Sequence, residues 1–156
     1  MRKLMLLVTV FGLAGLLWAA EPLVGTWKLN VAKSKFPPNQ MTAPKEETMV
    51  FRVVGDQFEL TITGTQKDGK AITGKYTSPI NGGVYRDMQA ASLEGELSVE
   101  TMFEPGNRFL TSLKSGKQIE VRHLVISKDG KTMSITYKGT DAKGKPIEEI
   151  GVYDKE

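Results

Sequence analysis

Cysteine is absent from this chain of 156 residues, and histidine occurs only once, as His123. Without cysteine the protein forms no disulfide bonds, no thiolate metal site and no lipid anchor of the bacterial lipoprotein type. A single histidine likewise excludes a His-rich metal site. A packed core must therefore stabilise the fold, and we predict neither a bound metal nor a cofactor.

The chain also lacks a strong excess of one charge. The full sequence has a net charge of +3, but Arg2 and Lys3 contribute to it from the N-terminal leader. From residue 21 onward there are 19 basic and 18 acidic side chains, and the two signs are interspersed. Domains that bind nucleic acid are usually clearly basic. We therefore expect no nucleic-acid partner.

Long apolar runs are missing except at the N-terminus, where Leu4–Leu17 follows Arg2 and Lys3 and precedes Ala19 and Ala20. This is the layout of a secretory signal peptide, and the run is too short to span a bilayer comfortably. A retained anchor is the weaker alternative. We expect cleavage after Ala20 and export to the periplasm or the medium. The mature chain, 21–156, would be one monomeric domain without a membrane span.

Helical periodicity is weak, whereas short alternating stretches separated by Gly-containing turns recur along the chain. The clearest stretch is Phe58–Thr63, in which apolar and polar residues alternate strictly. Prolines at positions 37, 38 and 44 argue against a helix in the segment that precedes these strands. We predict an all-β fold: an antiparallel up-and-down β-barrel of 8–10 strands. An open sandwich is the alternative, and pairing of the first and last strands would distinguish the two.

The stretch Leu23–Asn30 contains Gly25-x-Trp27, which resembles the signature of the lipocalins within the calycin superfamily. Its longer form, Val24-Gly25-Thr26-Trp27-Lys28-Leu29, is similar to the opening of fatty-acid-binding proteins, and Val152-Tyr153-Asp154-Lys155 to their closing strand. The whole chain also resembles small uncharacterised exported bacterial proteins. The resemblance implies a lipocalin-like barrel in which Gly25 and Trp27 have structural roles at the floor.

Three departures separate the chain from these families. A Pro-rich segment replaces the two-helix lid of fatty-acid-binding proteins, and Gly151 stands where they carry an Arg two residues before the final Tyr. Lipocalins pack a late Arg across the signature Trp, but no Arg follows Arg122 in this chain. The resemblance therefore implies the fold without implying a fatty acid as ligand.

Aromatic residues occur about once per predicted strand, so a closed barrel would gather those that face inward. Together with arginines that could hold a polar group, they suggest a site for a small apolar or amphipathic ligand in or at the mouth of the barrel. The competing interpretation assigns the aromatics to the core and the arginines to the rim. The candidate ligand-binding residues are Phe51, Tyr76, Tyr85, Arg86, Phe103, Phe109, Arg122, His123, Tyr137 and Tyr153.

His123 alternates with Ile119, Val121 and Val125, which predicts an interior position. There it could contact a ligand or serve as a hydrogen-bonded barrel residue. No Gly-x-Ser-x-Gly elbow accompanies it, and we expect no enzymatic activity. The sequence thus favours an exported binding protein. The alternative is a non-catalytic envelope or extracellular protein with a solidly packed barrel.

Overall fold

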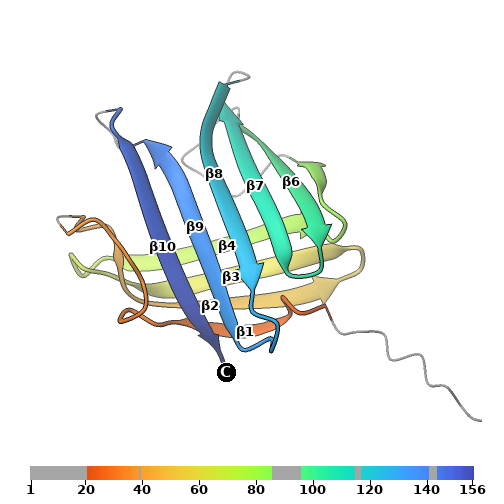
Figure 1. Cartoon of the computed structure of the whole chain (residues 1–156), viewed down its shortest axis with the longest axis horizontal. Coiled ribbons are helices and arrows are strands. Elements are labelled where there is room, and N and C mark those ends of the chain that lie inside the picture. Colours follow the sequence, from red (N-terminus) through yellow and green to blue (C-terminus); the bar gives the residue numbers. More distant parts are fainter. Residues whose placement is uncertain (1–20, 39, 86–95, 115–116, 141–143) are drawn as a thin grey trace, which may run out of the picture.

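The protein is described by a computed structural model over residues 21–38, 40–85, 96–114, 117–140 and 144–156 (Figure 1). Ten strands follow one another along the chain. They are β1 (Gly25–Leu29), β2 (Pro44–Val54), β3 (Gln57–Gln66), β4 (Ala71–Pro79), β5 (Gly83–Tyr85), β6 (Glu96–Glu104), β7 (Asn107–Lys114), β8 (Lys117–Ile126), β9 (Thr132–Thr140) and β10 (Pro146–Lys155). Within these ranges no helix is long and apolar enough to cross a membrane.

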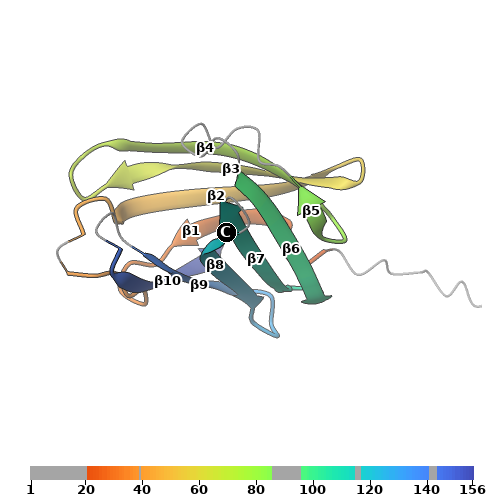
Figure 2. The ribbon, with the colours of Figure 1, turned by 90° about the horizontal axis from the view of Figure 1, so that it is seen from above.

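The strands form one antiparallel sheet in the order β4-β3-β2-β1-β10-β9-β8-β7-β6-β5. The first and last strands pair, with Trp27 opposite Lys155 and Leu29 opposite Tyr153. The sheet curls so that β1–β4 form one layer and β6–β10 the other, with crossing strand directions (Figures 1 and 2). The edges of the sheet are β4 and β5. The prediction of an antiparallel up-and-down β-barrel is confirmed, with ten strands.

Alternation along each strand sends one set of side chains between the two layers. Met49 and Phe51 on β2 are buried, and their register partners Ile62 and Leu60 on β3 pack against the same core. The buried core cluster draws residues from both layers of the sheet. Its members are Leu23, Trp27, Leu29, Met49, Phe51, Phe58, Met133 and Tyr153.

Trp27 is fully buried and closes one end of the space between the layers, which we call the floor. Its indole Nε1 donates a hydrogen bond to the Leu23 carbonyl oxygen at 2.8 Å. The Lys155 ammonium lies 4.9 Å from the centroid of the Trp27 ring and donates to the Pro22 carbonyl oxygen at 3.0 Å. Lys155 thus places a cation over the ring, as the late Arg of lipocalins does.

Gly25 leaves the space that Lys155 occupies. A Cβ at this position would lie 2.8 Å from the Lys155 Cε, and the φ angle of +137° is one that L-residues rarely adopt. The Gly-x-Trp spacing therefore has a local physical reason, because only glycine allows the last strand's lysine to cross the backbone and reach the Trp27 ring.

The segment between β1 and β2, which we call the strap, contains several turns and is fixed at both ends. Lys35 exchanges backbone hydrogen bonds of 2.7 and 2.9 Å with Ile150 on β10. Further along, the carbonyl oxygens of Met41 and Ala43 accept hydrogen bonds from the backbone of the β3–β4 turn. The Pro-rich strap thus connects β10 to the β3–β4 hairpin.

Replacing Lys155 tests the closure of the floor. We expect Lys155→Ala to lower the free energy of unfolding by about 1–2 kcal/mol, since it removes a cation–π contact and a hydrogen bond. Lys155→Arg should lose much less, because a guanidinium stacks on indole equally well. Chemical denaturation measures both, with Lys128→Ala at an exposed turn as the control. Equal losses for the Ala and Arg variants would contradict the assignment.

Candidate functional site

Three tyrosine rings lie against the inner wall of the barrel, each over a glycine two residues away on the same strand. The pairs are Tyr76 with Gly74, Tyr137 with Gly139 and Tyr153 with Gly151. An ideal Cβ on each glycine would lie 2.5–2.9 Å from an atom of the paired tyrosine. The rings therefore occupy space that only glycine leaves free, and they lie along the strands rather than across the interior.

Polar side chains gather beyond the apolar core, on the inward faces of β2, β8, β9 and β10. Tyr137 on β9 is the register partner of Arg122 on β8 and of Glu149 on β10, so these three residues lie side by side. On the facing layer, Glu47 shares its strand face with the buried Met49. We call this set the interior polar cluster; its members are Glu47, Glu120, Arg122, Tyr137, Glu149 and Tyr153.

Hydrogen bonds and an ion pair connect the members of the interior polar cluster. The Tyr153 hydroxyl donates to Glu47 Oε1 at 2.6 Å, which joins β10 to β2 across the barrel. Arg122 and Glu120 form an ion pair at 3.0 Å. From the strap, Gln40 Nε2 donates to Glu149 Oε1 at 2.6 Å. The strap is thereby attached directly to the cluster.

Although Arg122 is on the inward face of β8, 45% of its side chain is exposed. The partner Glu120 is much less exposed, at 14%. The Arg122 guanidinium also lies 5.9 Å from the centroid of the Tyr137 ring. An inward-facing arginine with this exposure shows that solvent reaches the cluster from the barrel interior.

Burial sets the protonation behaviour of the cluster. Desolvation raises the pKa of Glu47, an effect that the hydrogen bond from Tyr153 and the positive charge of Arg122 partly offset. Desolvation and the negative charge of Glu47 raise the pKa of Tyr153. The pKa of Tyr137 is raised for similar reasons, by burial and by neighbouring Glu120. Both tyrosines are therefore neutral hydrogen-bond donors at physiological pH.

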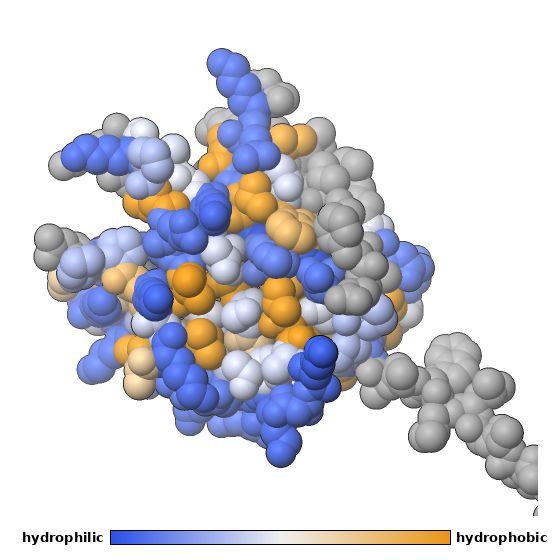
Figure 3. Space-filling model, viewed as in Figure 1, coloured by the Kyte–Doolittle hydropathy of each residue, from blue (hydrophilic) through white to orange (hydrophobic). Residues whose placement is uncertain are grey.

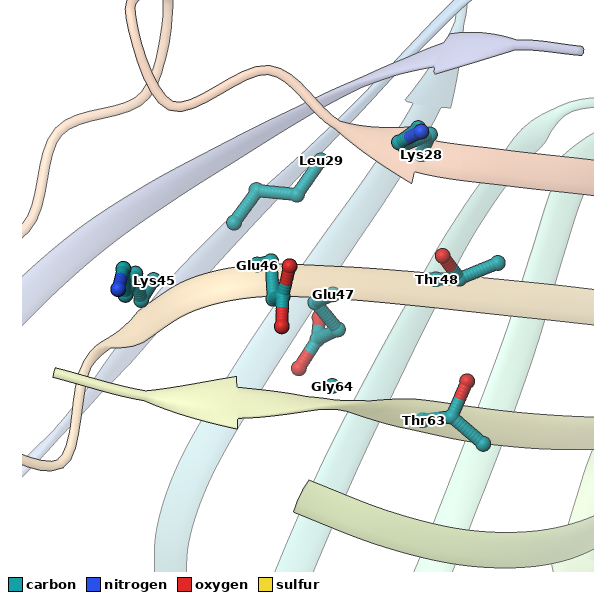
Figure 4. A pocket seen from close by; sticks show the side chains of 8 residues that line it. All are labelled: Lys28, Leu29, Lys45, Glu46, Glu47, Thr48, Thr63 and Gly64. Carbon is teal, nitrogen blue, oxygen red and sulfur yellow. The ribbon is translucent and has the colours of Figure 1, made fainter. Parts of the chain in front are cut away.

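A pocket of about 320 Å³ opens where β1 ends and β2 continues (Figure 4). Its lining comes from both faces of the sheet: Lys28 and Thr48 belong to the outer face, and Leu29 and Glu47 to the inner face. The remaining lining residues are Lys45, Glu46, Thr63 and Gly64. Because Glu47 belongs to both, the pocket adjoins the interior polar cluster.

Gly64 permits the irregular backbone beside this pocket. The β2–β3 register shifts between Pro44 and Glu46, and a Cβ on Gly64 would collide with the Glu46 carbonyl oxygen. The bulge lets β2 bend away from β1 toward the strap. The pocket is thus a consequence of how the two strands separate.

Five of the sequence-predicted ligand residues face the interior. Phe51 belongs to the apolar core, and Tyr76 lies on the wall of β4. Arg122, Tyr137 and Tyr153 come together in the interior polar cluster. Three other candidates cannot be placed: the side chains of Tyr85 and Phe103 and the whole of Arg86 lie outside the described residues.

Phe109 and His123 lie on the outer face, so the prediction that His123 points inward is wrong. Their rings stack with centroids 3.9 Å apart, and His123 Nε2 is hydrogen-bonded to Asn107 Oδ1 at 2.9 Å. The reason is that the core takes Leu124 and Ile126 from the other face of β8, although that face also carries Glu120 and Arg122 and is the less apolar of the two in sequence. The outer face of β7–β10 indeed shows hydrophobic side chains scattered among hydrophilic ones (Figure 3).

Sequence reasoning missed the carboxylates of the site, Glu47, Glu120 and Glu149. Strand alternation could have indicated Glu47 and Glu149. Glu47 is on the same face of β2 as Met49 and Phe51, and Glu149 is on the same face of β10 as Tyr153. Arg108 lies in the floor, where its guanidinium is 4.5 Å from the Phe58 ring centroid. No group of three or more potential metal ligands occurs in the described parts of the chain.

Comparison with solved structures shows that the fold resembles those of known β-barrel proteins. The zebrafish ileal bile acid-binding protein, solved with cholic acid, has a TM-score of 0.51 at 13% identity, over 86% of this chain and 99% of that one. Lobster apocrustacyanin A1 has a TM-score of 0.45 at 16% identity, over 88% of this chain and 63% of that one. No family model and no curated sequence matches the chain.

Removing the Tyr153 hydroxyl tests the cluster. At neutral pH we expect Tyr153→Phe to lower the free energy of unfolding by about 1–3 kcal/mol, since it leaves a buried carboxylate without its donor. The pKa of Glu47 is raised in the folded state, so the cost of burying its charge exists above that pKa and disappears as the pH falls through it. The loss should therefore shrink toward acidic pH.

Denaturation of Tyr153→Phe over a pH series measures this effect. Tyr76→Phe is the matched control, because the Tyr76 ring also lies over a glycine and no hydrogen bond of its hydroxyl is seen among the described residues. Losses of equal size for the two variants at every pH would rule out the role assigned to the Glu47–Tyr153 pair.

Proposed function

We propose that the protein is an exported, monomeric binding protein that holds a small, partly apolar molecule inside the barrel. The observation that carries this proposal is the interior polar cluster. Burying polar groups between two sheet layers costs free energy that an apolar filling would avoid. A barrel packed only for stability has no use for Arg122, Tyr137 and Glu47 on its inner face, whereas a ligand site does.

The arrangement of the interior suits an amphipathic molecule. The buried side chains of the floor are mainly apolar, among them Trp27, Phe58 and Met133, and the polar cluster lies farther along the barrel. The tyrosine rings are held against the wall, and solvent reaches Arg122. A molecule with an apolar body and one polar end would bury its body over the core and place its polar end at the cluster.

The fold supports the same proposal. The zebrafish protein of similar fold was solved in complex with cholic acid. The competing interpretation, a solidly packed envelope or extracellular protein, predicts that nothing enters the barrel. We propose binding rather than catalysis, because the single histidine is on the outer face and paired with Asn107.

Binding is tested with the neutral fluorescent probe N-phenyl-1-naphthylamine. We expect saturable binding, weakened at least about tenfold by Ile62→Trp, which fills the interior beside the core. Thr61→Trp adds the same ring on the outer face of the same strand and should leave affinity unchanged. Thermal melts show that both variants fold. If the probe fails to bind the folded wild type, the solidly packed alternative holds.

The proposal of export rests on the N-terminal leader of the sequence, and the contacts of the residues that follow it are compatible with its removal. Directly after the predicted cleavage point, Glu21 pairs with Arg108 at 3.4 Å, Pro22 accepts the Lys155 hydrogen bond, and Leu23 is buried. A mature chain that begins at Glu21 would thus keep every contact of the floor.

The chain's processing can be measured directly. When the full-length chain is expressed with a functional Sec pathway, we expect the mature protein to start at Glu21 in intact-mass and N-terminal sequence measurements. Ala20→Pro, placed at the cleavage site, should leave the leader attached, whereas Ala32→Pro in the strap should not affect processing. Recovery of uncleaved wild-type protein from the cytoplasm would contradict export.

A further inference from the structure

Glu47 is the point at which the pocket and the barrel interior meet. It lines the pocket between β1, β2 and β3, and its Oε1 accepts the Tyr153 hydroxyl hydrogen bond at 2.6 Å (Figure 4). No described residue donates a hydrogen bond to its second carboxylate oxygen. Glu47 therefore has acceptor capacity left at a place that a ligand entering the interior could reach.

The charges around Glu47 are mainly negative among the described inward-facing side chains. Glu120 and Glu149 add two further carboxylates, and Arg122 is the single guanidinium of the cluster. Arg122 is already paired with Glu120 at 3.0 Å. A ligand carboxylate beside Glu47 would be opposed by like-charge repulsion, and to pair with Arg122 it would have to displace Glu120.

Gln40 adds another acceptor at the same end of the barrel. Its amide nitrogen donates to Glu149, and its Oε1 is buried without a hydrogen-bond donor among the described residues. The site is therefore richer in acceptors than in donors. Two lysines line the pocket: Lys28 is on the outer face and pairs there with Glu156 at 3.6 Å, and Lys45 is exposed at the β2 bulge.

We propose that the polar end of the ligand is a cationic hydrogen-bond donor, of the primary ammonium class, which binds at Glu47 where the pocket meets the interior polar cluster. This inference rests on the proposed function and narrows it. An ammonium group would donate to the free Glu47 oxygen and gain from the neighbouring carboxylates, and a carboxylate ligand would be disfavoured at the same place.

The test is competition between dodecylamine and dodecanoate, which share one chain length and differ in the sign of their head group. Each compound is titrated against the complex of N-phenyl-1-naphthylamine with the wild-type protein at neutral pH. Its concentration is kept below the value at which the compound aggregates. We expect the amine to bind at least about tenfold more tightly than the acid. Glu47→Gln, which keeps the side-chain shape and an acceptor for Tyr153, should abolish most of that preference.

Glu46→Gln is the matched control, because Glu46 lines the same pocket but belongs to the outer face and accepts a hydrogen bond from Thr65 at 2.9 Å. It should leave the preference intact. Equal or tighter binding of dodecanoate, or a preference that survives Glu47→Gln, would overturn the inference while the proposed function stands. Failure of the uncharged probe to bind would instead overturn the proposed function.

Discussion

The pairing of β1 with β10 around the Trp27 side chain is the interaction on which the rest of the structure depends. It joins strands from opposite ends of the chain, and with them the two layers of the sheet. Lys155 covers the indole ring from the last strand, and Gly25 makes room for it on the first. Since there is no disulfide to hold the ends, this apolar and cation–π contact closes the floor.

Closure at one end allows the other end of the interior to be polar. The apolar core supplies stability near the floor, so the barrel tolerates buried carboxylates farther along, where Tyr153 and the strap residue Gln40 donate to them. The strap thus does more than connect two strands, because it also satisfies part of the site. The binding role and the preference for a donor group that we propose both rest on this division of the interior.

Much of the fold was predictable because its causes are local. Alternation, Gly-containing turns and the Gly25-x-Trp27 spacing act within a few residues of each other, and they predicted the strands and their up-and-down order. The site was predictable only in part. Arg122, Tyr137 and Tyr153 were identified by residue type, but Glu47 was missed and His123 was assigned to the wrong face. On β8 the face of His123 carries Ile119, Val121 and Val125, whereas the inner face includes Glu120 and Arg122, so parity favoured the wrong face.

The sequence by itself determined that the chain forms an antiparallel barrel stabilised by its core, since composition and period are properties of the chain alone. Only the tertiary structure decided which cation covers Trp27, which face of β8 points inward and which carboxylates meet the tyrosines. These facts depend on pairing between strands more than 100 residues apart, as in the contact of Glu47 with Tyr153. Such contacts leave no local pattern in the sequence. Glu47 and Tyr153 each fit the alternation of their own strand, and neither strand's pattern indicates which residue the other strand supplies.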